Sequence, residues 1–351
     1  MNIFCSWLSG LLFRLFFHVA GEWSFGEQLL RWGRGGPDFT VGLSYEGSLH
    51  LGASGSGKTS GGLRLQAVAM AQAGYGMLCQ TVKATSPSDV EFFVGIAKDA
   101  GRERSVVLVG PTHHLGINIL RYEMTASRLD GSLGDMAANV ATLFSFAAEL
   151  ALPNRGKQGD HIWRLAVESL VRHAVTVVYS ATGDLHLDDI VSVVKTTPQS
   201  ATQVTDAAWC RESTCIKMLG LAATRRPTDR NLELARSYFL SELPGFPPDT
   251  RNSVMFTFGA GCADLFQREP LRSMFFADTD YTPSIILDGA ILVVDCPVLE
   301  YREVGKIANG LLRICTQRVL ERRAKHTLIV SLRSRAARIW RIIVRPLQKS
   351  A

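Results

Sequence analysis

The chain has 351 residues, too many for one small domain. Hydrophobic residues make up 46% of it and charged residues 20%, a balance that excludes a disordered body. The net charge of +6 equals the six basic residues of the acid-free segment 331–351, so the rest is formally neutral and its charge alone does not predict nucleic-acid binding. Seven cysteines without a paired framework argue against an oxidised secreted domain. Cys210 and Cys215 are the nearest pair, but no second Cys or His pair stands at zinc-finger spacing.

The N-terminal segment from Ile3 to Ala20 is rich in apolar residues and approaches the length of a membrane span. A polar stripe recurs at every fourth residue, through Asn2, Ser6, Gly10, Arg14 and His18. The stripe favours an amphipathic helix over a span or a cleaved signal peptide. Docking on a membrane surface and packing on the core both explain it.

Strands alternate with helices in the next segment, after the Gly-rich break at Gly33–Pro37. The predicted strands are Phe39–Tyr45, Ser48–Leu51, Gly76–Val82 and Ser105–Gly110, and the predicted helices are Lys58–Ala73 and Ser88–Ala100. This alternation indicates an α/β fold, with a mostly parallel sheet covered by helices.

Beyond Leu120 the apolar spacing becomes helical, and it returns to strands only near the end. The predicted helices are Met136–Leu150, His161–Tyr179, Asn231–Leu240 and Thr250–Leu265. A buried strand Ile291–Asp295, a helix Glu303–Arg323 and a strand Thr327–Leu332 follow. We therefore expect a large all-α domain inserted in the α/β core.

The segment Gly52-Ala53-Ser54-Gly55-Ser56-Gly57-Lys58-Thr59 matches G-x-x-x-x-G-K-[ST], between a predicted strand and a predicted helix. Glycines let backbone N–H groups approach phosphates, and the helix adds the positive end of its dipole. Lys58 is the candidate catalytic cation for the β- and γ-phosphates, and Thr59 the candidate Mg²⁺ ligand. The motif predicts a P-loop NTPase (RecA-like) core that binds ATP with Mg²⁺; a flexible Gly/Ser linker is the structural alternative.

The expected organisation follows from this motif and from the helical insertion. It comprises an amphipathic, membrane-proximal segment (1–36), the first part of the P-loop core (37–120), the inserted all-α domain (121–280), an incomplete second part of the core (281–330) and a basic tail (331–351).

From about Gly47 to Arg323 the chain resembles the TraG/TraD-type coupling ATPases of conjugation and type IV secretion. Beyond the P-loop, the resemblance rests on three stretches: Gln80–Lys83, Gly116–Leu120 and Ile291–Tyr301 with the helix after it. It implies an ATP-driven motor that moves DNA or a DNA–protein complex toward secretion-channel proteins. It also implies a homo-hexamer on the cytoplasmic side, at the inner face of the cell membrane. Each of two residues in these stretches also has a purely structural explanation: Lys83 as a solvated loop lysine and Asn118 as a turn residue.

Hydrolysis by such an ATPase needs a strand-end carboxylate for Mg²⁺ and usually a glutamate beside it. Asp295 ends a predicted strand and is the candidate catalytic carboxylate, but Cys296 and Pro297 follow it. The predicted strand Thr327–Leu332 leads instead into the Arg-rich tail, so we expect the family pattern to be truncated or frame-shifted near residue 324. The alternatives to a motor are a nucleotide-binding module without hydrolysis and a non-functional fragment, and the tail itself has the composition to bind phosphate backbones or an anionic membrane.

Overall fold

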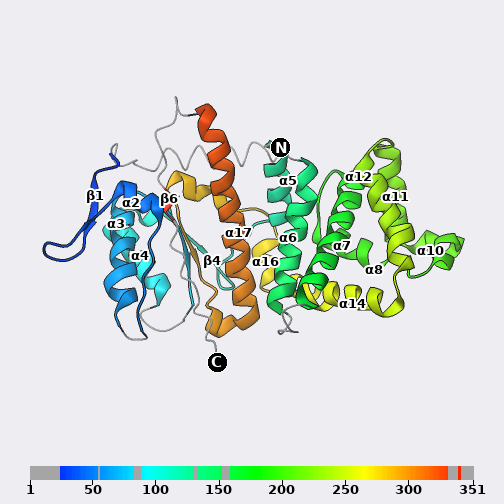
Figure 1. Cartoon of the computed structure of the whole chain (residues 1–351), viewed down its shortest axis with the longest axis horizontal. Helices are drawn as coiled ribbons and strands as arrows, with labels where there is room; N and C mark the ends of the chain where they lie inside the picture. Colours follow the sequence, from blue (N-terminus) through cyan, green and yellow to red (C-terminus); the bar gives the residue numbers. More distant parts are fainter. Residues whose placement is uncertain are drawn as a thin grey trace. The chain divides into compact units, whose positions relative to one another are not determined.

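The computed structural model describes residues 24–53, 56–82, 88–129, 133–151, 159–330 and 339–340 (Figure 1). The chain divides into two compact units. Among the described residues, one unit contains those up to Leu115 and from Tyr281 onward, and the other contains those of the intervening segment Gly116–Asp280. The described chain is mostly helical with a small parallel sheet, an arrangement compatible with an α/β fold.

The sheet of the first unit is built from short strands that are far apart in the sequence. Its strands are β3 (Gly76–Gln80), β4 (Val106–Val109) and β5 (Ile291–Val294), in the order β4-β5-β3, all parallel. The two-residue strand β6 (Ile339–Trp340) pairs with the other side of β3. Because β3 and β5 are buried along their whole length, they are apolar rather than alternating, except for Gln80 at the end of β3.

Two helices cover one face of this sheet. These are α3 (Arg64–Gln72) and α4 (Asp89–Asp99), drawn beside each other in Figure 1. Their buried side chains form one core with the strand residues that point to the same face: Ala67, Met70, Ala71, Phe93, Ile96, Ala97, Met77, Cys79, Ile291 and Val293. A capping box at Ser88 starts α4, which lies within the predicted helix Ser88–Ala100.

The other face of the sheet is covered by α17 (Val298–Val330), whose regular helical geometry is interrupted at Arg302. The Gln80 side chain at the end of β3 donates a hydrogen bond to the backbone oxygen of Asn309 on α17. Asn309 in turn donates through Nδ2 to the Cys296 oxygen at 3.0 Å. Polar side chains therefore tie α17 to the strand ends, where backbone groups would otherwise lack partners.

The predicted strand Phe39–Tyr45 is wrong beyond its first two residues. The strands β1 (Gln28–Arg31) and β2 (Asp38–Thr40) form an antiparallel hairpin, and the helix α2 (Val41–Glu46) follows directly. Thr40 caps this helix, because its hydroxyl accepts a hydrogen bond from the Leu43 N–H at 3.3 Å. The buried residues Val41 and Ser44 stand three apart, which is the spacing of a helix.

Two further strand predictions are wrong. Ser48–Leu51 pairs with no strand: Leu49 and Leu51 are 79% and 83% exposed, while Ser48 and His50 contact Gln66 on α3. The residues predicted as the strand Thr327–Leu332 continue α17 as far as Val330, because neither Gly nor Pro ends the helix before that point. Leu332 lies outside the described residues.

Short elements complete the first unit. They are the π-helix η1 (Lys58–Leu63) and the 3₁₀ helices η2 (Glu103–Ser105) and η5 (Pro283–Asp288).

The second unit, where it is described, contains helices and no strand. Its helices are α5 (Ile119–Leu129), α6 (Leu133–Ala151), α7 (Gly159–Thr182), α8 (Leu187–Lys195), α9 (Ala201–Thr205), α10 (Ala207–Glu212), α11 (Thr214–Arg225), α12 (Arg230–Ser237), η3 (Tyr238–Glu242), α13 (Leu243–Gly245), α14 (Pro248–Phe258), η4 (Gly259–Ala263), α15 (Asp264–Phe266) and α16 (Leu271–Phe275). The predicted helices Met136–Leu150 and His161–Tyr179 lie within α6 and α7.

The core of the second unit includes a cluster of three buried phenylalanines. The Phe144 ring lies parallel to Phe258 at 6.2 Å and edge-on to Phe266 at 5.0 Å. Within the described ranges, no helix has the length and apolarity needed to cross a membrane. The apolar N-terminal segment discussed above, 3–20, lies outside those ranges.

Candidate functional site

The predicted phosphate loop is a turn that leads into a helix. Gly57 has a positive φ of 77°, a conformation that favours glycine, and its oxygen accepts from the Gly61 N–H at 2.6 Å as η1 begins. The Ser56 N–H donates to the Ala53 oxygen at 3.2 Å, which closes the loop before the helix. Ser54 and Gly55 lie outside the described residues, as do the side chains of Lys58 and Thr59.

The start of this helix is directed toward one edge of the parallel sheet. After η1 the chain continues through α3, turns at Gly74 with φ of 83°, and enters β3 at Gly76. Because that turn is short and α3 packs on the sheet, the helix runs antiparallel to β3. The η1 end of the helix therefore lies at the carboxyl edge of the strands, where open α/β sheets bind their ligands.

The described part of the first helical turn is compatible with an anion. The first turn of η1 contains no acidic residue, so no carboxylate opposes an anion there. Backbone N–H groups at a helix start are orphan donors, and the dipole makes that end positive. Gly57 supplies the left-handed backbone that such a loop requires.

Asp295, the predicted carboxylate, lies directly after β5 at the same edge of the sheet. Its Oδ2 atom is 2.9 Å from Nε2 of His113, which follows β4, and both side chains are about a quarter exposed. The Asp295 N–H donates to the Val109 oxygen at 2.7 Å. The end of β4 thus contacts the backbone of Asp295, and the segment after β4 contacts its side chain.

The strand ends are fixed to one another around Asp295. The Thr81 hydroxyl, just after β3, donates to the Val294 oxygen at 2.7 Å, and the Leu299 N–H donates to the Val82 oxygen at 3.1 Å. Burial raises the pKa of the Cys296 thiol to about 12, so this neighbour of Asp295 stays neutral and is no nucleophile at pH 7. Among the described residues, no group of three or more His, Cys, Asp and Glu side chains is placed to hold a metal ion.

Sequence reasoning missed His113, although a signal was present. His113 and His114 follow the short apolar strand β4, and the ends of such strands are where α/β sheets carry functional side chains. The pairing of His113 with Asp295 has no local signature, because 182 residues separate them.

The two weaker family-like stretches have structural explanations. Asn118 starts α5: its Oδ1 accepts from the Arg121 N–H at 3.1 Å, and its own N–H donates to the Thr279 hydroxyl at 3.0 Å. It therefore acts as a helix cap in the second unit. In Gln80–Lys83, the side chains of Gln80 and Thr81 bind backbone oxygens, and Lys83 lies outside the described residues.

Comparison with known proteins identifies no relative. No protein-family model matches the chain, no curated protein matches it, and no solved structure matches its fold.

Proposed function

We propose that this chain binds a nucleoside triphosphate, with ATP as the expected ligand, on the loop Gly52–Thr59. The position of the loop in the fold is the observation that supports this proposal. The loop leads into a helix that starts without an acidic residue and is directed at the carboxyl edge of a parallel sheet. That combination of sequence, helix start and sheet edge is where phosphate groups bind in α/β proteins.

The proposed roles follow from the chemistry of each side chain. The Lys58 ammonium opposes the charge of the β- and γ-phosphates, and the Thr59 hydroxyl supplies an oxygen ligand for Mg²⁺. Asp295 offers a carboxylate oriented by His113. If Mg²⁺ bound here, Thr59 would be its protein ligand, and the ion would neutralise part of the phosphate charge.

The wider role that we propose is that of a coupling ATPase for DNA transfer. Its support is the resemblance to TraG/TraD-type proteins, which implies a hexamer working on DNA beside a secretion channel. One observation favours a second candidate, a nucleotide-binding module without turnover. Cys296 and Pro297 follow Asp295, and Cys296 is fully buried, so the strand end has no adjacent glutamate to orient a water molecule.

Equilibrium ATP binding and steady-state hydrolysis by the purified chain, with and without single-stranded DNA, test the proposal. We expect Lys58→Ala to weaken ATP binding about tenfold to a hundredfold, since hydrogen bonds to charged groups contribute about 1.5–3 kcal/mol. Lys98→Ala is the matched control. Lys98 is an exposed lysine in the last turn of α4, so its replacement should leave ATP binding unchanged. Equal ATP affinity in both variants would refute nucleotide binding at this loop.

The same assay separates the two candidates. Hydrolysis that single-stranded DNA stimulates and Lys58→Ala abolishes supports the coupling motor. Lys58-dependent binding without turnover supports the binding module.

A further inference from the structure

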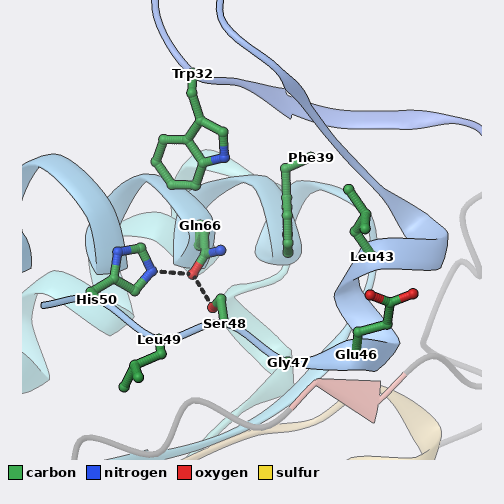
Figure 2. Close-up of a pocket in the computed structure, with 9 residues that line it drawn as sticks. All are labelled: Trp32, Phe39, Leu43, Glu46, Gly47, Ser48, Leu49, His50 and Gln66. Atoms are coloured by element: carbon green, nitrogen blue, oxygen red, sulfur yellow. Dashed lines mark hydrogen bonds between the residues drawn. The ribbon is translucent and has the colours of Figure 1, made fainter.

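A pocket of about 320 Å³ lies in the first unit, beside the residues that precede the phosphate loop (Figure 2). Its walls come from the β1–β2 hairpin, from α2 and the segment after it, and from α3. The residues that line it are Trp32, Phe39, Leu43, Glu46, Gly47, Ser48, Leu49, His50 and Gln66. Because His50 stands two residues before Gly52, the pocket and the loop share one continuous stretch of chain.

Aromatic rings form much of the wall. Trp32 lies between two others: its ring centroid is 6.4 Å from that of Phe39 and 5.9 Å from that of His50. Trp32 is half-buried, so part of its ring is open to a ligand. Figure 2 shows the three rings around the amide of Gln66. Such a surface favours a planar ring system that stacks on an aromatic face.

The Gln66 side-chain amide, at the centre of the pocket, forms hydrogen bonds through its oxygen but not through its nitrogen. Its Oε1 atom accepts from the Ser48 hydroxyl at 3.0 Å and lies 2.9 Å from His50 Nε2. An amide oxygen only accepts, so His50 carries its proton on Nε2 in this contact. These two donors leave Nε2 of Gln66 as the free end of the amide.

Gln66 is completely buried, and its Nε2 has no hydrogen-bond partner among the described residues. A buried donor without a partner costs about 1–3 kcal/mol, so a native protein keeps one where a ligand or another group satisfies it. In Figure 2 the nitrogen points away from Ser48 and His50, toward the side of the pocket formed by Phe39 and Leu43. A ligand that presents an acceptor there completes the hydrogen bonding of Gln66.

The pocket stands at a suitable distance from the phosphate loop. Gln66 is eight residues after Lys58 on one continuous helical segment, which places it about 10–12 Å along the helix axis. In a bound nucleoside triphosphate, the ribose and the first phosphates would span this interval between the base and the phosphates at Lys58. The carboxylate of Glu46, which also lines the pocket, can accept a hydrogen bond from an amino group.

We propose that this pocket binds the purine base of the nucleotide whose phosphates lie on Gly52–Thr59, and adenine fits it best. The inference rests on the proposed function. The base stacks on Trp32, a ring nitrogen accepts from Gln66 Nε2, and the exocyclic amine donates to Glu46. Uracil has no unprotonated ring nitrogen to accept from Gln66 and offers less surface for stacking.

Isothermal titration calorimetry with ATP, UTP and inorganic tripolyphosphate tests the pocket. Stacking on an aromatic side chain contributes about 1–3 kcal/mol, so we expect ATP to bind at least about tenfold tighter than either other ligand. Trp32→Ala should lower the affinity for ATP about tenfold and leave the affinity for tripolyphosphate unchanged. Trp32→Phe should retain most of the affinity for ATP. Trp209→Ala, in the second unit, is the matched control and should change neither affinity.

Gln66→Met keeps the size of the side chain and removes its polar atoms. We expect it to lower the ratio of ATP to tripolyphosphate affinity, a ratio that a general loosening of the loop would leave unchanged. Equal affinities for ATP and tripolyphosphate in the unmodified chain, or equal losses for both in Trp32→Ala, would overturn the base pocket and leave the proposed function standing. Binding of both ligands that does not depend on Lys58 would overturn the proposed function and the pocket with it.

Discussion

Replacing Gly110 by alanine should destabilise the first unit and displace Asp295. Gly110 follows β4 and packs against the backbone of Asp295: a Cβ atom there would stand 2.1 Å from the Asp295 oxygen and 2.8 Å from its carbonyl carbon. Backbone atoms cannot rotate away as a flexible side chain would. The two chain segments must therefore separate, against the 2.7 Å hydrogen bond from the Asp295 N–H to the Val109 oxygen.

The expected cost is that of overpacking a well-packed site, about 1–3 kcal/mol. For a cooperative unit of this size, each kcal/mol lowers the midpoint of thermal unfolding by about 2–4 °C. We therefore expect Gly110→Ala to unfold about 2–12 °C below the unmodified chain, measured by circular dichroism at 222 nm.

Gly95→Ala is the matched control, because it makes the same chemical change within α4, where a Cβ would meet no atom within 4 Å. Alanine is the better helix former by about 1 kcal/mol, so this variant should be as stable as the unmodified chain or more so. If the two alanine variants unfolded at the same temperature, the argument from the close approach at Gly110 would be refuted. In Gly110→Ala we also expect weaker Mg²⁺ dependence of ATP binding, because Asp295 has moved.

Three further predictions concern single side chains. Burial, and then the charge of Arg172, lower the pKa of His173 to about 4, whereas a histidine in the unfolded chain takes up its proton near pH 6.5. The free energy of unfolding should therefore be constant above pH 6.5 and fall by about 1–2 kcal/mol toward pH 4. Urea titrations should show a smaller fall in His173→Phe, which keeps a ring against Tyr238. Asn118→Ala removes the cap of α5 and should cost about 1 kcal/mol in the same titrations, whereas Asn118→Asp, which keeps an acceptor, should cost less. The guanidinium of Arg102 donates to three backbone oxygens. Arg102→Met should lower the free energy of unfolding, measured by urea titration, by about 2–3 kcal/mol. An unchanged value would show that water replaces the guanidinium at those oxygens.

Much of the secondary structure was predictable because its signals are local. The apolar runs at β3 and β5 have the composition of strands buried on both faces, and both were found. The residues that form the capping box at Ser88 are close together in the sequence, and so are the apolar residues that set the helical spacing in α6 and in α7. The sequence therefore shows these signals directly.

The wrong predictions involve short apolar segments in which a strand partner is missing or a local helix signal outweighs the strand-like composition. Ser48–Leu51 alternates as a strand does, but no neighbouring strand pairs with it, and its polar side chains bind Gln66 instead. Val41 begins a helix because Thr40 caps it, a signal hidden in an apolar run. The end of α17 has β-branched residues and no helix breaker, and there the helix continues.

The sequence by itself determined the phosphate-loop motif and the apolar periods of most strands and helices, because each depends on the spacing of near neighbours along the chain. Only the tertiary structure decided the strand order β4-β5-β3, the pairing of His113 with Asp295 and the ring of aromatic side chains around Gln66. These features bring together residues far apart in sequence. Burying the sheet between α3, α4 and α17 supplies the free energy that closes those long loops and fixes which strand ends meet.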